Sequence, residues 1–129
     1  MTLEPASAEE ASVLVANERF YQAFNQKDFD AMDHVWARET PVVCVHPGWN
    51  VLVGRQPVLD SWQGILGNPA QPRIVVGGAT VTIVGETAVV VCREFVAGTP
   101  LAATNLFVRE DGNWRIFHHH SGPVSWTET

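Results

Sequence analysis

Apolar residues recur every three or four positions in the first part of the chain, and this spacing predicts amphipathic helices. The first predicted helix covers residues 7–25, with Ser7 as N-cap and Glu10 as its capping-box partner. Its apolar stripe consists of Val13, Ala16, Phe20 and Phe24. A second short helix is expected after Asp28, which is placed to cap it. Its apolar face consists of Phe29, Met32, Val35 and Trp36.

The middle of the chain reads as a strand followed by a third helix. The run "VVCVH" (residues 42–46) is β-branched and predicts a strand, and "PGWN" predicts a turn. Residues 54–66 predict a helix with Pro57 in its first turn, where a proline is tolerated. The apolar stripe of this helix consists of Val58, Trp62, Ile65 and Leu66.

The second half of the chain predicts strands joined by tight turns. The expected strands are residues 73–84, 87–97, 101–109 and 114–121. Gly77 and Gly78 indicate a bulge or bend in the first of these. Helices followed by a run of strands favour a single α+β domain over residues 1–129, in which a curved, mostly antiparallel sheet wraps around the N-terminal helices. Such an arrangement leaves one pocket between helices and sheet, where a function is sought first.

Composition narrows the possible partners. Hydrophobic residues make up 46% of the chain and charged residues 17%, which is typical of a globular protein. The net charge is −6 and only eight Lys and Arg residues are present, so we expect no nucleic-acid partner. No apolar run reaches the roughly 20 residues of a membrane helix, and no basic N-terminal signal is recognisable. We therefore expect no membrane partner, a cytoplasmic protein, and buried thiols at Cys44 and Cys92.

The triple histidine near the C-terminus is divided by strand alternation. One face of the last predicted strand would carry Trp114, Ile116, His118 and His120, and the other Arg115, Phe117, His119 and Ser121. We expect His118 and His120 to face the pocket and His119 to face outward. Because the strand over residues 101–109 is apolar on both faces, its outer face needs a cover. We expect a homodimer through this convex face, with Arg115, Phe117 and His119 in the interface.

Three segments carry a resemblance to a known superfamily: "FYQAFNQKDFDAM", "VVCVHPGWNVLVGRQPVLDSW" and "ATNLFVREDGNWRIFHHHSGP". Together they resemble the nuclear transport factor 2-like superfamily, a cone-shaped α+β fold shared with ketosteroid isomerases and SnoaL-like polyketide cyclases. Lys27-Asp28 stands in place of the usual Gly-Asp between the first two helices. "HPGW" and "HHHSGP" resemble the SnoaL-like subgroup most, which is related to the association domain of calcium/calmodulin-dependent protein kinase II.

The resemblance implies positions for site residues. Ketosteroid isomerase uses an aspartate base with a tyrosine and a protonated aspartic acid as an oxyanion hole. Its base corresponds to His46 and its protonated aspartic acid to Asn105, while its tyrosine corresponds to Phe20, one residue before Tyr21. Pocket positions of its last strand correspond to His118 and His120. The resemblance therefore implies a retained pocket outline with changed chemistry, and steroid isomerase activity is not transferred.

The candidate catalytic residues are His46 as a general base, His118 or His120 as an acid or orienting group, and Asn105 as a hydrogen-bond donor. Candidate substrate-binding walls are Phe20, Trp49, Trp62 and Phe107. Each also has a structural interpretation, as a satisfied polar group or a core aromatic. His118, His120 and His46 could chelate a metal, but no second spacing signature supports this, and we expect neither a metal nor a cofactor.

Two further polar positions receive structural interpretations. Arg55 is expected to pair with a carboxylate or to cap carbonyl groups near the third helix. Arg93-Glu94 is expected at a solvated strand end or in an interface salt bridge.

Two functions follow as hypotheses. The first is cofactor-free acid–base chemistry on a small apolar or carbonyl-containing molecule, of the isomerase, dehydratase or cyclase type. The second is a non-catalytic, homo-oligomerising binding or association module.

Overall fold

The structure is a computed structural model that describes residues 7–125. Three helices and a six-stranded mixed sheet make up the fold, which confirms the predicted α+β class. The helices are α1 (Ala8–Asn25), α2 (Phe29–Val35) and α3 (Arg55–Leu66). The strands are β1 (Val43–Val45), β2 (Leu52–Val53), β3 (Ile74–Val84), β4 (Thr87–Val96), β5 (Thr99–Glu110) and β6 (Asn113–Pro123).

Side-chain caps fix where the first two helices begin. The Ser7 hydroxyl accepts from the Glu10 backbone N–H at 3.0 Å, and the Glu10 carboxylate accepts from the Ser7 N–H at 2.9 Å. This is the predicted capping box. The Asp28 carboxylate caps α2 by accepting from the Ala31 N–H at 3.0 Å. These contacts satisfy N–H groups that a helix start otherwise leaves unpaired.

The sheet order is β2-β1-β6-β5-β4-β3. All neighbouring pairs are antiparallel except β1 and β6, which run parallel. The strand β2 was not predicted from the sequence, because two residues are too few to form an alternating pattern. The register of β3 against β4 shifts between Gly77 and Thr80, which confirms the bulge predicted there.

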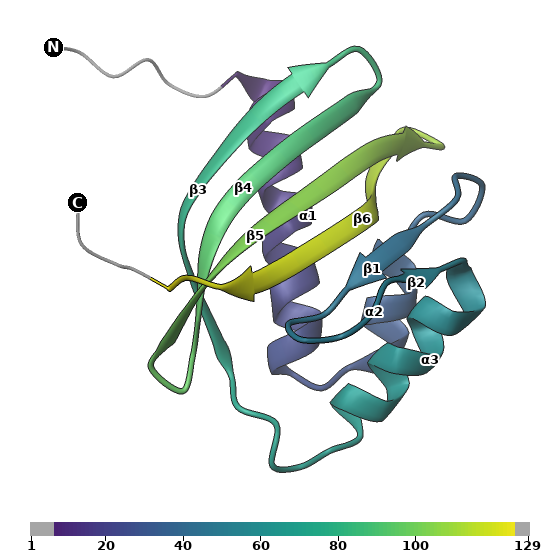
Figure 1. Ribbon diagram of the computed structural model, residues 1–129. Helices are drawn as coiled ribbons and strands as arrows, with labels where there is room; N and C mark the ends of the chain where they lie inside the picture. Colours follow the sequence, from purple (N-terminus) through teal and green to yellow (C-terminus); the bar gives the residue numbers. More distant parts are fainter. Residues whose placement is uncertain (1–6, 126–129) are drawn as a thin grey trace, which may run out of the picture.

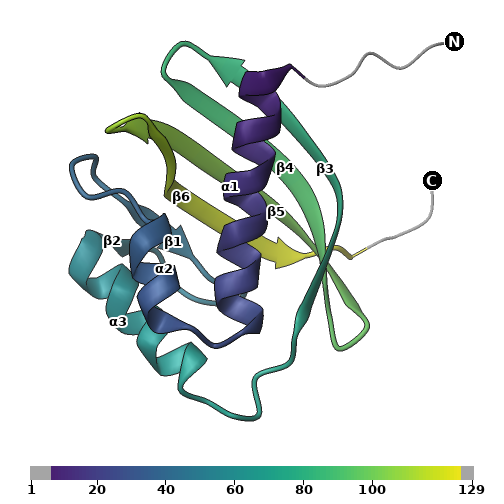
Figure 2. The same ribbon diagram turned by 180° about the vertical axis from the view of Figure 1, so that it is seen from behind.

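One face of the sheet is covered by helices and the other is not. The helix α1 runs behind the strands in Figure 1 and in front of them in Figure 2. Its C-terminal end is tied to β3 by Asn25, whose side chain bonds the backbone N–H and C=O of Ile74 at 2.8 Å each. Phe20 lies at the centre of the core, with ring centroids of Tyr21 at 4.8 Å and Trp62 at 5.5 Å. The fold thus encloses its core on the helix-covered side alone.

A bulge in β6 reverses the predicted orientation of the triple histidine. Leu106 of β5 pairs with His118, but the next residue, Phe107, pairs with Ile116, so Phe117 is an extra residue in β6. One extra residue moves every later side chain to the opposite face. His119 is consequently buried, with 3% of its surface exposed, whereas His120 is exposed on the outer face. The predicted alternation across this strand was therefore wrong beyond Ile116.

The bulge also changes the residues expected in an interface. His119 faces the interior, and Phe117 is partly buried against the core. Arg115 donates to the backbone carbonyl of His34 and lies 3.9 Å from the Glu110 carboxylate. His119 is therefore not outward-facing, Phe117 is only partly exposed, and Arg115 is engaged within its own chain.

Candidate functional site

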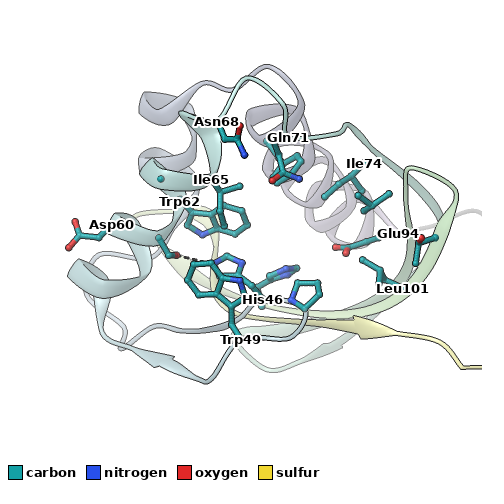
Figure 3. Close-up of a pocket in the computed structure, with 17 residues that line it drawn as sticks. His46, Trp49, Asp60, Trp62, Ile65, Asn68, Gln71, Ile74, Glu94 and Leu101 are labelled. Carbon is teal, nitrogen blue, oxygen red and sulfur yellow. Dashed lines mark hydrogen bonds between the residues drawn. The ribbon is translucent and has the colours of Figure 1, made fainter.

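A cavity of about 700 Å³ opens between α3, the loop after β1 and the inner face of β4–β6 (Figure 3). Its apolar wall includes Phe24, Trp49, Trp62, Ile65, Ile74 and Leu101. Four buried polar side chains, which we call the polar floor, also line it: His46, Ser61, Glu94 and His119. An apolar pocket with a few convergent polar groups is the usual form of a small-molecule site.

His46 follows β1 and is held by α3. Its Nε2 lies 2.8 Å from the Ser61 hydroxyl oxygen, and that hydroxyl donates to the Val58 carbonyl at 2.6 Å. The ring packs edge-on against Trp62 at 4.6 Å and Trp49 at 4.8 Å between centroids. Only 4% of His46 is exposed, and burial lowers its pKa to about 4. His46 is therefore a neutral imidazole at physiological pH.

His119 reaches the cavity from β6, next to β5. Its Nδ1 lies 2.6 Å from Oδ1 of Asn105, and its ring lies 5.0 Å from Phe20 and 6.5 Å from His46 between centroids. Burial, with smaller contributions from the neighbouring imidazoles, lowers the pKa of His119 to about 3. The second imidazole of the polar floor is thus neutral as well.

Glu94 is the carboxylate of the polar floor and is only 2% exposed. Its two oxygens accept from the hydroxyls of Tyr21 and Ser121, each at 2.6 Å. Such short separations are typical of hydroxyls that donate to an ionised carboxylate. Within residues 7–125, no Lys or Arg forms an ion pair with Glu94. In Figure 3 its carboxyl group points into the cavity.

Behind the polar floor, a hydrogen-bonded chain joins Glu94 to His119. The Asn105 amide nitrogen donates to the Tyr21 hydroxyl at 3.1 Å and to Asn17 Oδ1 at 2.9 Å. Burial, reinforced by the Glu94 charge, raises the pKa of Tyr21 well above its ordinary value. Tyr21 is accordingly a neutral donor that orients Glu94.

Three of the predicted site residues line the cavity: His46, Trp49 and Trp62. Asn105, Phe20 and Phe107 are buried and do not belong to its lining. His118 and His120 are not in the lining, because the β6 bulge turns them away. The prediction that they face the pocket was wrong, and the histidine that meets His46 there is His119.

Glu94 and Ser61 are buried polar residues of the lining that the sequence did not predict as site residues. Glu94 was expected at a solvated strand end or in an interface salt bridge, yet it continues the inward series Ala88, Val90 and Cys92 of β4 at strict alternation. That alternation was the available signal. Ser61 lies one residue before Trp62 in α3, and a single serine in a helix carries no comparable signal. Arg55 behaves as expected, since it pairs with Asp33 at 2.6 Å and donates to the Ala37 carbonyl at 2.9 Å.

The described part of the chain offers neither a cluster of metal ligands nor a membrane-spanning helix. Residues 7–125 contain no group of three or more His, Cys, Asp or Glu side chains arranged to hold a metal ion. Within the same residues, no helix is long and apolar enough to cross a membrane. Cys44 and Cys92 are both free and buried, as predicted.

Comparison with known proteins places the chain in a family. Residues 13–125 match the family of SnoaL-like domains. A candidate dehydratase of the nuclear transport factor 2-like family from Streptomyces avermitilis superposes with a TM-score of 0.84 and is 33% identical, over 92% of this chain and 97% of that one. A candidate calcium/calmodulin-dependent protein kinase type II association domain from Thiobacillus denitrificans superposes with a TM-score of 0.77 and is 29% identical, over 95% of this chain and 100% of that one.

A plant protein is also similar. The F-box protein SKIP8 of Arabidopsis thaliana is 26% identical over 112 residues, which are 85% of this chain and 48% of that protein. The chain thus spans about half the length of this curated relative. On the match over residues 13–125 and the agreement with the Streptomyces structure, the chain belongs to the SnoaL-like family of the nuclear transport factor 2-like superfamily.

Proposed function

We propose that this protein binds a small, largely apolar organic molecule in its cavity and moves a proton on it without a cofactor, with Glu94 as the proton acceptor. The observation that carries the proposal is a buried carboxylate, without a cationic partner among the described residues, at the wall of an apolar cavity. An unpaired buried charge is costly to a fold. Such groups concentrate at functional sites, where carboxylates serve as general bases.

The two histidines complement this carboxylate as hydrogen-bonding groups. Their low pKa values, about 4 for His46 and about 3 for His119, keep both rings neutral at physiological pH. A neutral imidazole can accept a hydrogen bond from a substrate hydroxyl. We therefore assign the role of base to Glu94 in place of His46. His46 and His119 then orient the substrate by accepting its hydrogen bonds.

Across the cavity from His46 and Trp49, the side chains of Asn68 and Gln71 add amide groups to the lining (Figure 3). Asn68 uses its Oδ1 to accept from the Ala70 N–H at 3.0 Å, which leaves its NH₂ group free to donate. A substrate carbonyl would meet donors on this side, while its hydroxyl would meet acceptors at the polar floor.

The simplest reaction for this arrangement is the dehydration of a β-hydroxy carbonyl compound. Glu94 reversibly takes the proton from the carbon beside the carbonyl, and the C–H electron pair forms an enolate. When the carbonyl re-forms from the enolate, that electron pair makes the new carbon–carbon double bond. The C–O bond to the hydroxyl breaks, and the hydroxide leaves as water with the proton returned by Glu94. The similarity to the candidate dehydratase of Streptomyces avermitilis supports this reaction type.

The test uses a model substrate, 4-hydroxy-4-phenylbutan-2-one, whose dehydration gives an enone that absorbs in the ultraviolet. Wild type should form the enone faster than buffer alone. Glu94→Gln, which keeps the side-chain shape, should slow the reaction by about 10²–10⁴-fold, the usual contribution of a general base. Glu86→Gln, an exposed carboxylate outside the cavity, is the matched control and should keep the wild-type rate. A full rate in Glu94→Gln would rule out its role as the base.

A second proposal concerns assembly: we propose that two copies of the chain associate through the uncovered outer face of the sheet. Large apolar side chains are exposed on β3 and β4: Val75, Val84, Val91 and Phe95. Their β3–β4 pairings, Val75 with Phe95 and Thr80 with Val91, place them on the face opposite Glu94. The similarity to the candidate association domain from Thiobacillus denitrificans supports this proposal.

A further inference from the structure

The hydrogen positions at the polar floor follow from the bonds around it, beginning with His46. The Ser61 hydroxyl has one proton, which goes to the Val58 carbonyl at 2.6 Å. Its oxygen can then only accept from His46, so Nε2 of His46 carries the ring proton. The other nitrogen, Nδ1, holds a lone pair, and its hydrogen-bonding neighbour within residues 7–125 is the weakly donating thiol of Cys44 at 3.9 Å.

His119 has the opposite tautomer, which also follows from its hydrogen bonds. The Tyr21 hydroxyl donates to Glu94, so it accepts from the Asn105 amide nitrogen, which also donates to Asn17. The remaining atom of that amide, Oδ1, is an acceptor, and Nδ1 of His119 must donate to it. Nε2 of His119 therefore holds a lone pair, and it has no hydrogen-bond partner among the described residues.

The free lone pairs of the polar floor thus all belong to acceptors: Nδ1 of His46, Nε2 of His119 and the Glu94 carboxylate. Both Glu94 oxygens accept from hydroxyls behind them, and none of the residues that line the cavity is Lys or Arg. The indole N–H of Trp62 is buried beyond the reach of solvent and has no partner among residues 7–125. A ligand that turned acceptors toward the polar floor would place them against buried acceptors without a proton between them. An anionic ligand would be repelled by the Glu94 carboxylate, with no cation in the lining to offset the repulsion.

We infer that the ligand is an uncharged molecule that turns two hydroxyl or N–H donors toward His46 and His119, with an apolar body against Trp49 and Trp62. The centroids of the two imidazoles lie 6.5 Å apart, and at this separation two donors on one small ring can each form a hydrogen bond to one imidazole. This inference rests on the proposed function of the cavity and names its substrate class.

The ligand test uses four aromatic probes of matched shape: resorcinol, 3-methoxyphenol, 1,3-dimethoxybenzene and 3-hydroxybenzoate. Binding is followed by NMR titration of the ¹⁵N-labelled protein, with the indole signals of Trp49 and Trp62 as cavity reporters. Each lost donor should weaken binding about tenfold, the value of one net hydrogen bond. The anionic probe should bind more weakly than 3-methoxyphenol, which has the same single hydroxyl.

His119→Leu removes one acceptor and should reduce the preference for resorcinol over 3-methoxyphenol to about one- to twofold, since only one donor then finds a partner. His34→Leu, an exposed histidine outside the cavity, is the matched control and should keep the full preference. Equal affinity of all four probes, or tighter binding of the anion, would overturn the inference while leaving the cavity a ligand site. Failure of every probe to shift the two indole signals would contradict the inference and the proposed ligand site together.

A measurement without ligand tests the same inference. Long-range ¹H–¹⁵N correlation spectra distinguish the two neutral tautomers of a histidine ring. At neutral pH, His46 should carry its proton on Nε2 and His119 on Nδ1. A proton on Nε2 of His119 would give the polar floor a donor and would overturn the inference even if His119→Leu failed to fold.

Discussion

Two neutral histidines in the cavity wall make the stability of the protein depend on pH. Burial holds the pKa of His46 at about 4 and that of His119 at about 3, below the ordinary value of about 6.5 that both regain on unfolding. As the pH falls below 6.5, His46 and His119 become protonated in the unfolded chain but stay neutral in the folded chain. The contribution of the two histidines to the free energy of unfolding is fully present above this pH, and it is lost as the pH falls to the folded-state pKa values.

The free energy of unfolding should therefore decrease between pH 6.5 and pH 4, by about 3 kcal/mol from His46 alone, because each unit of pKa difference corresponds to about 1.4 kcal/mol. Urea denaturation at a series of pH values measures this decrease. His46→Gln should make the dependence shallower by that amount, while His34→Gln, at an exposed position, should not change it. Identical pH profiles of His46→Gln and wild type would contradict a neutral, buried His46.

A buried carboxylate ties two elements of the fold together. Glu110, at the end of β5, accepts from the backbone N–H groups of Arg38, Glu39 and Thr40 at 2.8–3.0 Å, in the segment between α2 and β1. Burial alone would raise the pKa of Glu110, but these hydrogen bonds outweigh it and lower the pKa. The segment that leads into β1, and so toward His46, is fixed by this side chain.

Glu110→Ala should lower the free energy of unfolding by about 2–4 kcal/mol, because it leaves three N–H donors without their charged acceptor. The contribution of the ionised Glu110 is present above its unfolded pKa and is lost as the pH falls through the lower folded pKa. The penalty measured by urea denaturation should therefore be larger at pH 7 than at pH 3. The control is Asp111→Asn, which removes an exposed carboxylate at the neighbouring turn position and keeps a residue type that tolerates the positive φ there. It should leave the free energy of unfolding nearly unchanged. If Glu110→Ala changed the free energy of unfolding as little as Asp111→Asn, the stabilising role of Glu110 would be refuted.

The sequence predicted the elements better than the details of the site. Helical spacing and caps located α1 and α2, and alternation located the four long strands. The orientation of His119 depended on the single extra residue Phe117, and nothing in the local sequence distinguishes a bulged strand from a regular one. The tautomers depended on bonds between residues far apart in the sequence, such as Asn105 and Asn17.

At the scale of the whole molecule, the two faces of the sheet serve different purposes. The inner face, with α1 and α3, encloses the core and the cavity, while the outer face leaves Val91 46% and Phe95 37% exposed. Contiguous apolar surface on a soluble protein is typical of a protein–protein interface. The proposed dimer would cover this face, whereas the cavity is lined by α3 and the inner face of the sheet.

Light scattering at micromolar concentration should give twice the chain mass for wild type. Val91→Lys places a charge on the outer face of β4 and should shift the protein to the monomer mass, since an unpaired charge disfavours burial in an interface. Val15→Lys adds the same charge to an exposed position of α1, on the helix-covered side of the sheet, and should leave the dimer intact. A monomeric wild type, or a Val91→Lys protein that stays dimeric, would rule out this interface.

The central claim is that Glu94 accepts a proton from a small molecule in the cavity, and solvent deuterium exchange tests it most directly. In D₂O, wild type should incorporate deuterium beside the carbonyl of 4-hydroxy-4-phenylbutan-2-one faster than buffer alone, as followed by ¹H NMR. Glu94→Gln should reduce the exchange to the buffer rate, while Glu86→Gln should not change it. Exchange by wild type no faster than buffer, or equal exchange by wild type and Glu94→Gln, would contradict the account.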